Sequence, residues 1–141
     1  MLILPAIITN FSVAEILQGW EVPEDLHPNI FPTLTVLQHL RTDYGKPIFI
    51  SSVYRDKTYN KGVGGKSKSL HLVFNAIDFF VEKSNDLKML YNKLNKWDES
   101  GYFKFLPKPG SMGLGLYERQ YFIHLDTRGV LNREAPARWK G

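Results

Sequence analysis

Two of the four histidines in this 141-residue chain lie near carboxylates in patterned segments. His71 precedes Asp78 by seven residues, and His124 is followed two residues later by Asp126. Side chains two residues apart on a strand project from the same face, so His124 and Asp126 are expected side by side. Imidazole nitrogens and carboxylate oxygens bind Zn²⁺, and catalytic zinc sites commonly use three protein ligands. His71, Asp78 and His124 are therefore a candidate metal-binding set.

Each of these residues also has an ordinary structural interpretation. His71 could be a surface histidine at the end of a loop, and Asp78 could hydrogen-bond to neighbouring backbone. His124 and Asp126 could belong to a strand that has one solvent-exposed face. Their spacing alone leaves both interpretations open.

Composition excludes several other kinds of site. The chain has no cysteine, which excludes disulfides, thiolate zinc sites, iron–sulfur clusters and cysteine nucleophiles. The net charge is +4, and the segment 55–68 holds five basic residues and one acid. Such a segment favours an anionic partner only weakly, and a solvated lysine-rich loop explains it equally well. A nucleic-acid-binding domain would rest on this segment alone, so we expect no nucleic-acid partner.

Length and hydropathy favour one domain that does not enter a membrane. A chain of 141 residues with 43% hydrophobic and 23% charged residues is typical of a single globular domain, here 1–141. No apolar stretch approaches the roughly 20 residues that cross a bilayer. The apolar start, Met1–Ile8, is interrupted by Pro5 and has neither a basic region nor a cleavage site. We therefore expect no signal peptide and no membrane insertion.

Three helices are expected from capping signals and hydrophobic spacing. The segment Ser12–Glu15 matches a capping box, which predicts a short helix that ends near Gln18. Leucines at helical spacing predict a second helix over 32–44. A third helix is expected to be capped by Ser84 and to end near Trp97.

Four short strands complete the expected fold. β-Branched and aromatic residues predict strands at Ile48–Val53, Ala76–Val81, Gly113–Tyr117 and Tyr121–Asp126. The last two are joined by a short turn that suits a hairpin, and the segment 56–70 is interpreted as a loop. Because strands and helices do not alternate regularly, we predict an α+β fold in which a small, mostly antiparallel sheet has its helices packed to one side.

The order of these segments resembles the zinc D-Ala-D-Ala carboxypeptidases, peptidase family M15, in particular the C-terminal-domain type of its subfamily A. The resemblance runs through most of the chain, and the order and spacing of its pieces are more specific than any piece alone. The matching segments are Asn10–Glu15, Ser52–Arg55, Tyr59–Asn60, Val63–Gly65, Ser69–His71, Ala76–Asp78, Gly113–Tyr117, Phe122–Gly129 and Arg138–Trp139. The fold implied is that shared by hedgehog domains and D-Ala-D-Ala peptidases.

The resemblance also implies a site and a cofactor. It implies a Zn²⁺ ion held by His71, Asp78 and His124, with hydrolysis by a metal-activated water. It implies that the substrate is bound by Tyr54, Arg55 and Ser69. The Arg55 guanidinium would bind a peptide carboxylate through two hydrogen bonds or stabilise the developing oxyanion. Trp139 is expected to pack near the site.

Two positions depart from the family pattern. Phe74 stands where a glycine is usual, and we expect its bulky side chain to lie beside the site and to reshape the pocket or narrow the substrate range. Tyr121 stands where several members have the acid that acts as general base. Asp126 is the preferred base, although it could instead orient His124 from behind, and Glu118 is the competing candidate.

Two functions from different classes follow. The first is a zinc metallopeptidase that cleaves peptide bonds in bacterial peptidoglycan, as a D-Ala-D-Ala carboxypeptidase or endopeptidase, such as a phage endolysin. It would be a monomer made in the cytoplasm that acts on the cell wall after release. The alternative, motivated by Phe74 and Tyr121, is a non-catalytic, zinc-containing module of the same fold that binds wall peptides or a protein.

Overall fold

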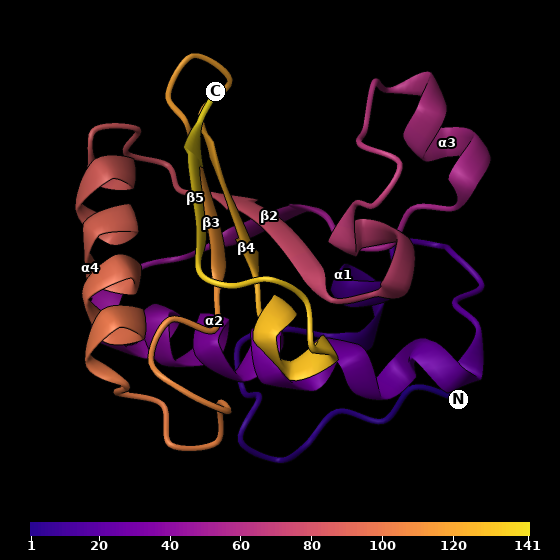
Figure 1. The fold of residues 1–141 in the computed structure, drawn as a ribbon, viewed down its shortest axis with the longest axis horizontal. Coiled ribbons are helices and arrows are strands. Elements are labelled where there is room, and N and C mark those ends of the chain that lie inside the picture. The colour runs from indigo at the N-terminus through magenta and orange to yellow at the C-terminus, as the bar shows by residue number, and fades with distance from the viewer.

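A computed structural model describes all 141 residues and shows one five-stranded sheet with four α-helices (Figure 1). The helices are α1 (Val13–Leu17), α2 (Ile30–Tyr44), α3 (Lys57–Gly62) and α4 (Asp86–Ser100). The strands are β1 (Phe49–Ser52), β2 (Ala76–Phe80), β3 (Gly113–Tyr117), β4 (Phe122–Asp126) and β5 (Ala137–Lys140). Three 3-10 helices complete the chain: η1 (Glu24–Asn29), η2 (Leu70–Val73) and η3 (Arg128–Leu131). No helix is long and apolar enough to span a membrane.

The sheet is mostly antiparallel, as predicted. Its strand order is β1-β2-β4-β3-β5, and only the β3–β5 pair is parallel. In this register Asp78 of β2 lies opposite His124 of β4, which lies opposite Gly115 of β3. Residues far apart in the sequence therefore share one row across the centre of the sheet.

The two faces of the sheet differ in chemistry because strand side chains alternate. One face is apolar and fully buried, with Ile77, Phe79, Leu114, Leu116, Ile123 and Leu125. Helices α2 and α4 pack against the sheet and share one hydrophobic core with these side chains. The opposite face carries Asp78, His124 and Asp126, as alternation requires. The α+β fold with helices to one side is confirmed.

The predicted helices are present, with shifted ends. Ser12 and Glu15 form the expected capping box at the start of α1. The prediction for α4 was wrong at both ends, since Asn85 rather than Ser84 precedes its first turn and the helix continues to Ser100. Helix α2 begins at Ile30, directly after η1, which the sequence patterns did not predict.

Two further elements correct the predictions. The segment 56–70 is not a continuous loop, because it contains α3. The Asp56 side chain caps this helix by accepting a hydrogen bond from the backbone nitrogen of Tyr59 at 2.8 Å. The helix is polar, so no hydrophobic period marks it. Strand β5 was missed because it is short and polar and depends on its pairing with β3.

Candidate metal centre

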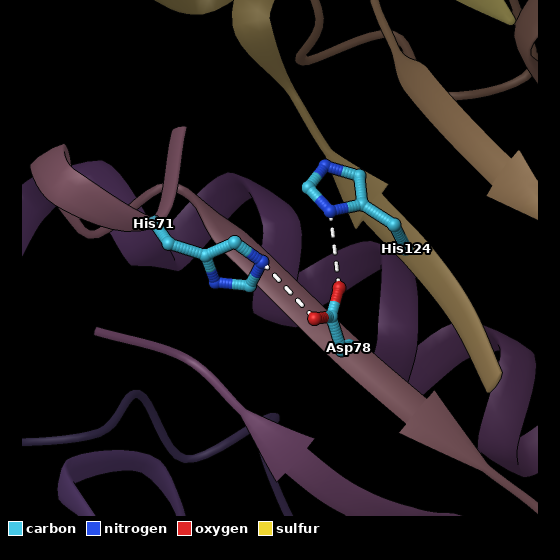
Figure 2. Close-up of side chains that lie close together, drawn as sticks. All are labelled: His71, Asp78 and His124. Atoms are coloured by element: carbon cyan, nitrogen blue, oxygen red, sulfur yellow. Dashed lines mark hydrogen bonds and ion pairs between the residues drawn. The ribbon is translucent and has the colours of Figure 1, made fainter. Parts of the chain in front are cut away.

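The three candidate ligands converge from three elements (Figure 2). His71 lies in η2, Asp78 in the middle of β2 and His124 opposite it on β4. One ligand atom from each lies within 4.8 Å of the others. The residues are only 2%, 4% and 8% exposed, respectively. The segment between β1 and β2, which contains α3 and η2, thus brings His71 to a position that faces Asp78 and His124.

His71 presents a nitrogen that has no hydrogen-bond partner. Its Nδ1 lies 2.6 Å from the carbonyl oxygen of Val53 and donates to it, which leaves the lone pair on Nε2. That Nε2 is buried, makes no hydrogen bond, and lies 3.2 Å from Asp78 Oδ2. Two electron-rich atoms facing each other in a buried site are the arrangement that a cation stabilises.

His124 is held by a carboxylate on each side of its ring. Its Nδ1 lies 3.0 Å from Asp78 Oδ1, and its Nε2 lies 2.7 Å from Asp126 Oδ2. Burial disfavours the charged ring, but these two carboxylates outweigh burial and raise the pKa of His124 to about 9. Without a metal, the ring is therefore an imidazolium at neutral pH that donates to both aspartates.

Asp78 stays ionised in this buried position. Burial would raise its pKa, but the hydrogen bond from His124 outweighs burial and lowers the pKa well below its usual range. Arg55 adds an ion pair, with its Nη2 3.3 Å from Asp78 Oδ2. The Arg55 guanidinium also donates to Ser52 Oγ at 3.2 Å. In this structure Arg55 thus contacts the candidate ligand Asp78.

Asp126 is fully buried, and donors surround its carboxylate. It accepts from His124, from the backbone nitrogen of Gly113 at 3.1 Å, and from Arg128 at 2.9–3.1 Å. Burial would raise the pKa of Asp126, but the bonds from His124 and Arg128 lower it well below its usual range. This arrangement fixes the His124 ring and directs its Nδ1 toward Asp78.

The donor set fits a zinc ion. When Nε2 of His124 donates to Asp126, its Nδ1 can offer a lone pair, as Nε2 of His71 already does. Two imidazole nitrogens and one carboxylate oxygen are among the commonest ligands of catalytic zinc. Each histidine has a hydrogen-bond partner on its other nitrogen, which is the usual arrangement behind metal-binding imidazoles.

Two glycines of β3 make room for the groups behind His124. A Cβ on Gly113 would come within 2.6 Å of Asp126 and Arg128, and one on Gly115 would collide with the indole of Trp139. Trp139 lies 5.0 Å from the His124 ring, centroid to centroid, so its predicted position near the site is confirmed. Arg128 stacks on the same indole at 5.4 Å. Sequence reasoning gave Arg128 no role, although its position two residues after Asp126 was a signal.

Three other candidates lie away from the ligands or in a different setting. Glu118 is exposed in the β3–β4 turn and has no hydrogen bond or ion pair with the site. Tyr121, in the same turn, is 59% exposed.

The expectation that Phe74 would lie beside the site was wrong. Its side chain is fully buried in the hydrophobic core, near His27 and Tyr54, and its backbone is left-handed with φ 59°.

The three residues expected to bind substrate line one cavity. Tyr54, Arg55 and Ser69 border a cavity of about 570 Å³ next to the metal centre. Ser69 also caps η2 by accepting from the backbone nitrogen of His71 at 3.2 Å. The candidate ligands do not line this cavity, and Arg55 connects the two because it borders the cavity and contacts Asp78.

Comparison with known proteins gives one result. A protein-family model described as Peptidase M15 matches residues 9–126, which include all three candidate ligands and Asp126. No curated protein matches the chain.

Proposed function

The chain belongs to the peptidase M15 family, and from this premise we propose that it is a zinc-dependent peptidase that hydrolyses a peptide bond in the stems or cross-links of bacterial peptidoglycan. One observation supports the metal-dependent part above all others. The buried Nε2 of His71 faces the carboxylate of Asp78 without a hydrogen-bond partner. A cation at this point would give both atoms a partner.

The residues divide the work as follows. His71, Asp78 and His124 would hold the zinc ion. When bound, zinc acidifies a water and polarises the scissile carbonyl, so no side-chain nucleophile is required. Arg55 would pair with Asp78 and face the substrate side, where it borders the cavity. Tyr54 and Ser69 would contact the substrate in that cavity.

For Asp126 we propose the positioning role rather than that of general base. A base needs a lone pair free to accept a proton near neutral pH. The oxygens of Asp126 already accept from His124, Arg128 and the Gly113 backbone, and its pKa is lowered. The carboxylate is therefore suited to keeping His124 in one orientation and one tautomer.

A non-catalytic binding module of the same fold is the alternative function. One observation favours it: the two carboxylates at the centre, Asp78 and Asp126, are both engaged by histidine and arginine side chains. Glu118, the other candidate base, lies exposed in a turn. Such a module would bind zinc and wall peptides without cleaving them.

Digestion of purified peptidoglycan tests the proposal. Zinc-loaded protein is incubated with peptidoglycan, and new amino and carboxyl ends are identified by mass spectrometry. We expect release of peptide fragments that a chelator stops and added zinc restores. The His71→Ala variant should be inactive, and His39→Gln serves as a control because His39 packs among aromatic rings away from the centre.

The outcomes separate the two functions. Zinc-dependent binding to peptidoglycan without new chain ends would establish the binding module. Cleavage that continues in the presence of chelator, or in His71→Ala, would contradict the metallopeptidase.

A further inference from the structure

The cavity beside the metal centre is strongly cationic. Besides Arg55, its lining includes Lys57, Lys68 and Arg133, with Asp56 as the only acid. These cations come from α3, from the segment before η2 and from the segment after η3. Basic residues from three separate parts of the chain thus line one cavity.

Three of these cations have no acidic partner. Lys57, Lys68 and Arg133 form no ion pair, and the hydrogen bond that Arg133 makes is to the backbone carbonyl of Lys68 at 3.0 Å. The carboxylate of Asp56 is occupied as the cap of α3. The donors of Arg55, by contrast, face Asp78 and two uncharged side chains. The cavity therefore has unpaired positive charge that the metal centre does not use.

We propose that Lys57, Lys68 and Arg133 form a subsite for a carboxylate of the substrate peptide, separate from any group that Arg55 binds. This rests on the proposed function, since it supposes that the substrate reaches across Arg55 toward the zinc ion. An anionic group in a concave site bordered by several cations gains charge-assisted hydrogen bonds that a neutral amide cannot make. The subsite would select peptides that carry a free carboxylate near the scissile bond.

The shape of the site favours a compact carboxylate over a nucleic-acid strand. Single strands are bound in long grooves where successive bases stack on aromatic side chains. This open cavity has a volume of about 570 Å³, and Tyr54 is its only aromatic lining residue. A peptide carboxylate with its neighbouring atoms fits such a space.

Equilibrium binding to two matched peptides tests the subsite. The probes are an N-acetylated pentapeptide with the sequence of a peptidoglycan stem and the same peptide with every carboxylate converted to carboxamide. Binding to the metal-free chain is measured by calorimetry and by amide shifts of Ser67–Ser69, so no cleavage is required. We expect the carboxylate form to bind about tenfold tighter or more, the size of one to two charge-assisted hydrogen bonds.

A charge-matched pair of variants locates the preference. Lys57→Gln, Lys68→Gln and Arg133→Gln combined should lose most of the preference for the carboxylate peptide. The control combines Lys61→Gln, Lys83→Gln and Lys104→Gln, which removes the same charge from exposed lysines that do not line the cavity and form no ion pair. This control should keep the preference. The double variant Lys57→Gln and Lys68→Gln, at two exposed positions, should lose most of the preference even if the triple variant folds poorly.

Kinetics separate this inference from the proposed function. In the zinc-loaded protein, loss of the subsite should raise KM for the carboxylate peptide about tenfold and leave kcat within about twofold, because the cations act in binding. If neither peptide is cleaved, the peptidase fails while the binding comparison still decides the subsite. Equal binding of both peptides, no binding of either, a preference kept by the triple variant, or tighter binding of a single-stranded oligonucleotide at the same cations would overturn the inference.

Discussion

At the scale of single residues, the chemistry depends on which ring nitrogen of each histidine is free. Nδ1 of His71 hydrogen-bonds to the backbone carbonyl of Val53, and Nε2 of His124 hydrogen-bonds to the buried carboxylate of Asp126. Both remaining nitrogens face Asp78. Neutral histidine has one donor and one acceptor nitrogen, so these contacts determine which atom is available to a cation.

Removal of His71 should remove the metal. We expect about one zinc per chain in the wild-type protein and close to none in His71→Ala, because two ligands hold zinc far more weakly than three. Elemental analysis of both proteins, purified alike without a histidine tag, measures this. His39→Gln should retain the wild-type content. An equal zinc content in His71→Ala would place the metal elsewhere.

Neutralising Asp126 should weaken zinc binding without abolishing it. Asp126→Asn keeps the shape of the side chain but removes the negative charge behind His124. Loss of such a partner typically costs about 10- to 100-fold in metal affinity, so we expect a loss of that size. Competition with a chromophoric chelator measures the affinity. An unchanged affinity combined with complete loss of activity would instead support Asp126 as the general base.

At the scale of elements, the left-handed turn after η2 connects the site to the core. Phe74 ends η2 with φ 59° and buries its ring completely. A side chain in this backbone region costs roughly 1–2 kcal/mol. Burial of the aromatic ring offsets that cost, so phenylalanine is accepted at this position.

Phe74→Gly should therefore destabilise the protein. Truncation of a buried phenylalanine costs about 3–5 kcal/mol, and relief of the backbone strain returns only about 1–2 kcal/mol. We expect a net loss of about 2 kcal/mol in the free energy of unfolding, measured by urea denaturation. Tyr121→Gly is the matched control because Tyr121 has φ 60° but is 59% exposed, and it should change stability by less than about 1 kcal/mol. Equal effects of the two substitutions would show that the Phe74 ring contributes little.

At the scale of the whole molecule, the metal centre links stability to pH. In the metal-free protein the pKa of His124 is raised from 6.5 to about 9, so folding favours its protonated form. The resulting stability is complete below about pH 6.5 and is lost as the pH rises through 9. Asp78 and Asp126 have lowered pKa values, so their contribution is present above about pH 4 and is lost as the pH falls.

The metal-free protein should therefore melt at a lower temperature at about pH 9.5 than at about pH 6. Thermal unfolding in the presence of chelator measures the change, and His124→Gln should flatten it because the titrating ring is gone. Saturating zinc should raise the melting temperature most at neutral to alkaline pH, where less work is needed to remove the proton from His124. A melting temperature of the metal-free protein that rises over this pH range would contradict the imidazolium between two carboxylates.

Elements that carry their own local signals could be predicted from the sequence. Leucine spacing in α2, the capping box at Ser12 and the alternation along β2 and β4 each reflect the conformation of a few neighbouring residues. The order of the segments was specific enough to indicate the family. Alternation also put Asp78 on the polar face, apart from the apolar side chains.

How these residues meet could be learned only from the folded chain. The register of β2 against β4 places Asp78 opposite His124. The hydrogen bond from Nδ1 of His71 to the Val53 carbonyl leaves Nε2 as the nitrogen with a free lone pair. Strand β5 and the burial of Phe74 likewise depend on long-range or packing contacts. Side-chain orientation and proton position depend on partners across the fold, and no local pattern in the sequence encodes those distances.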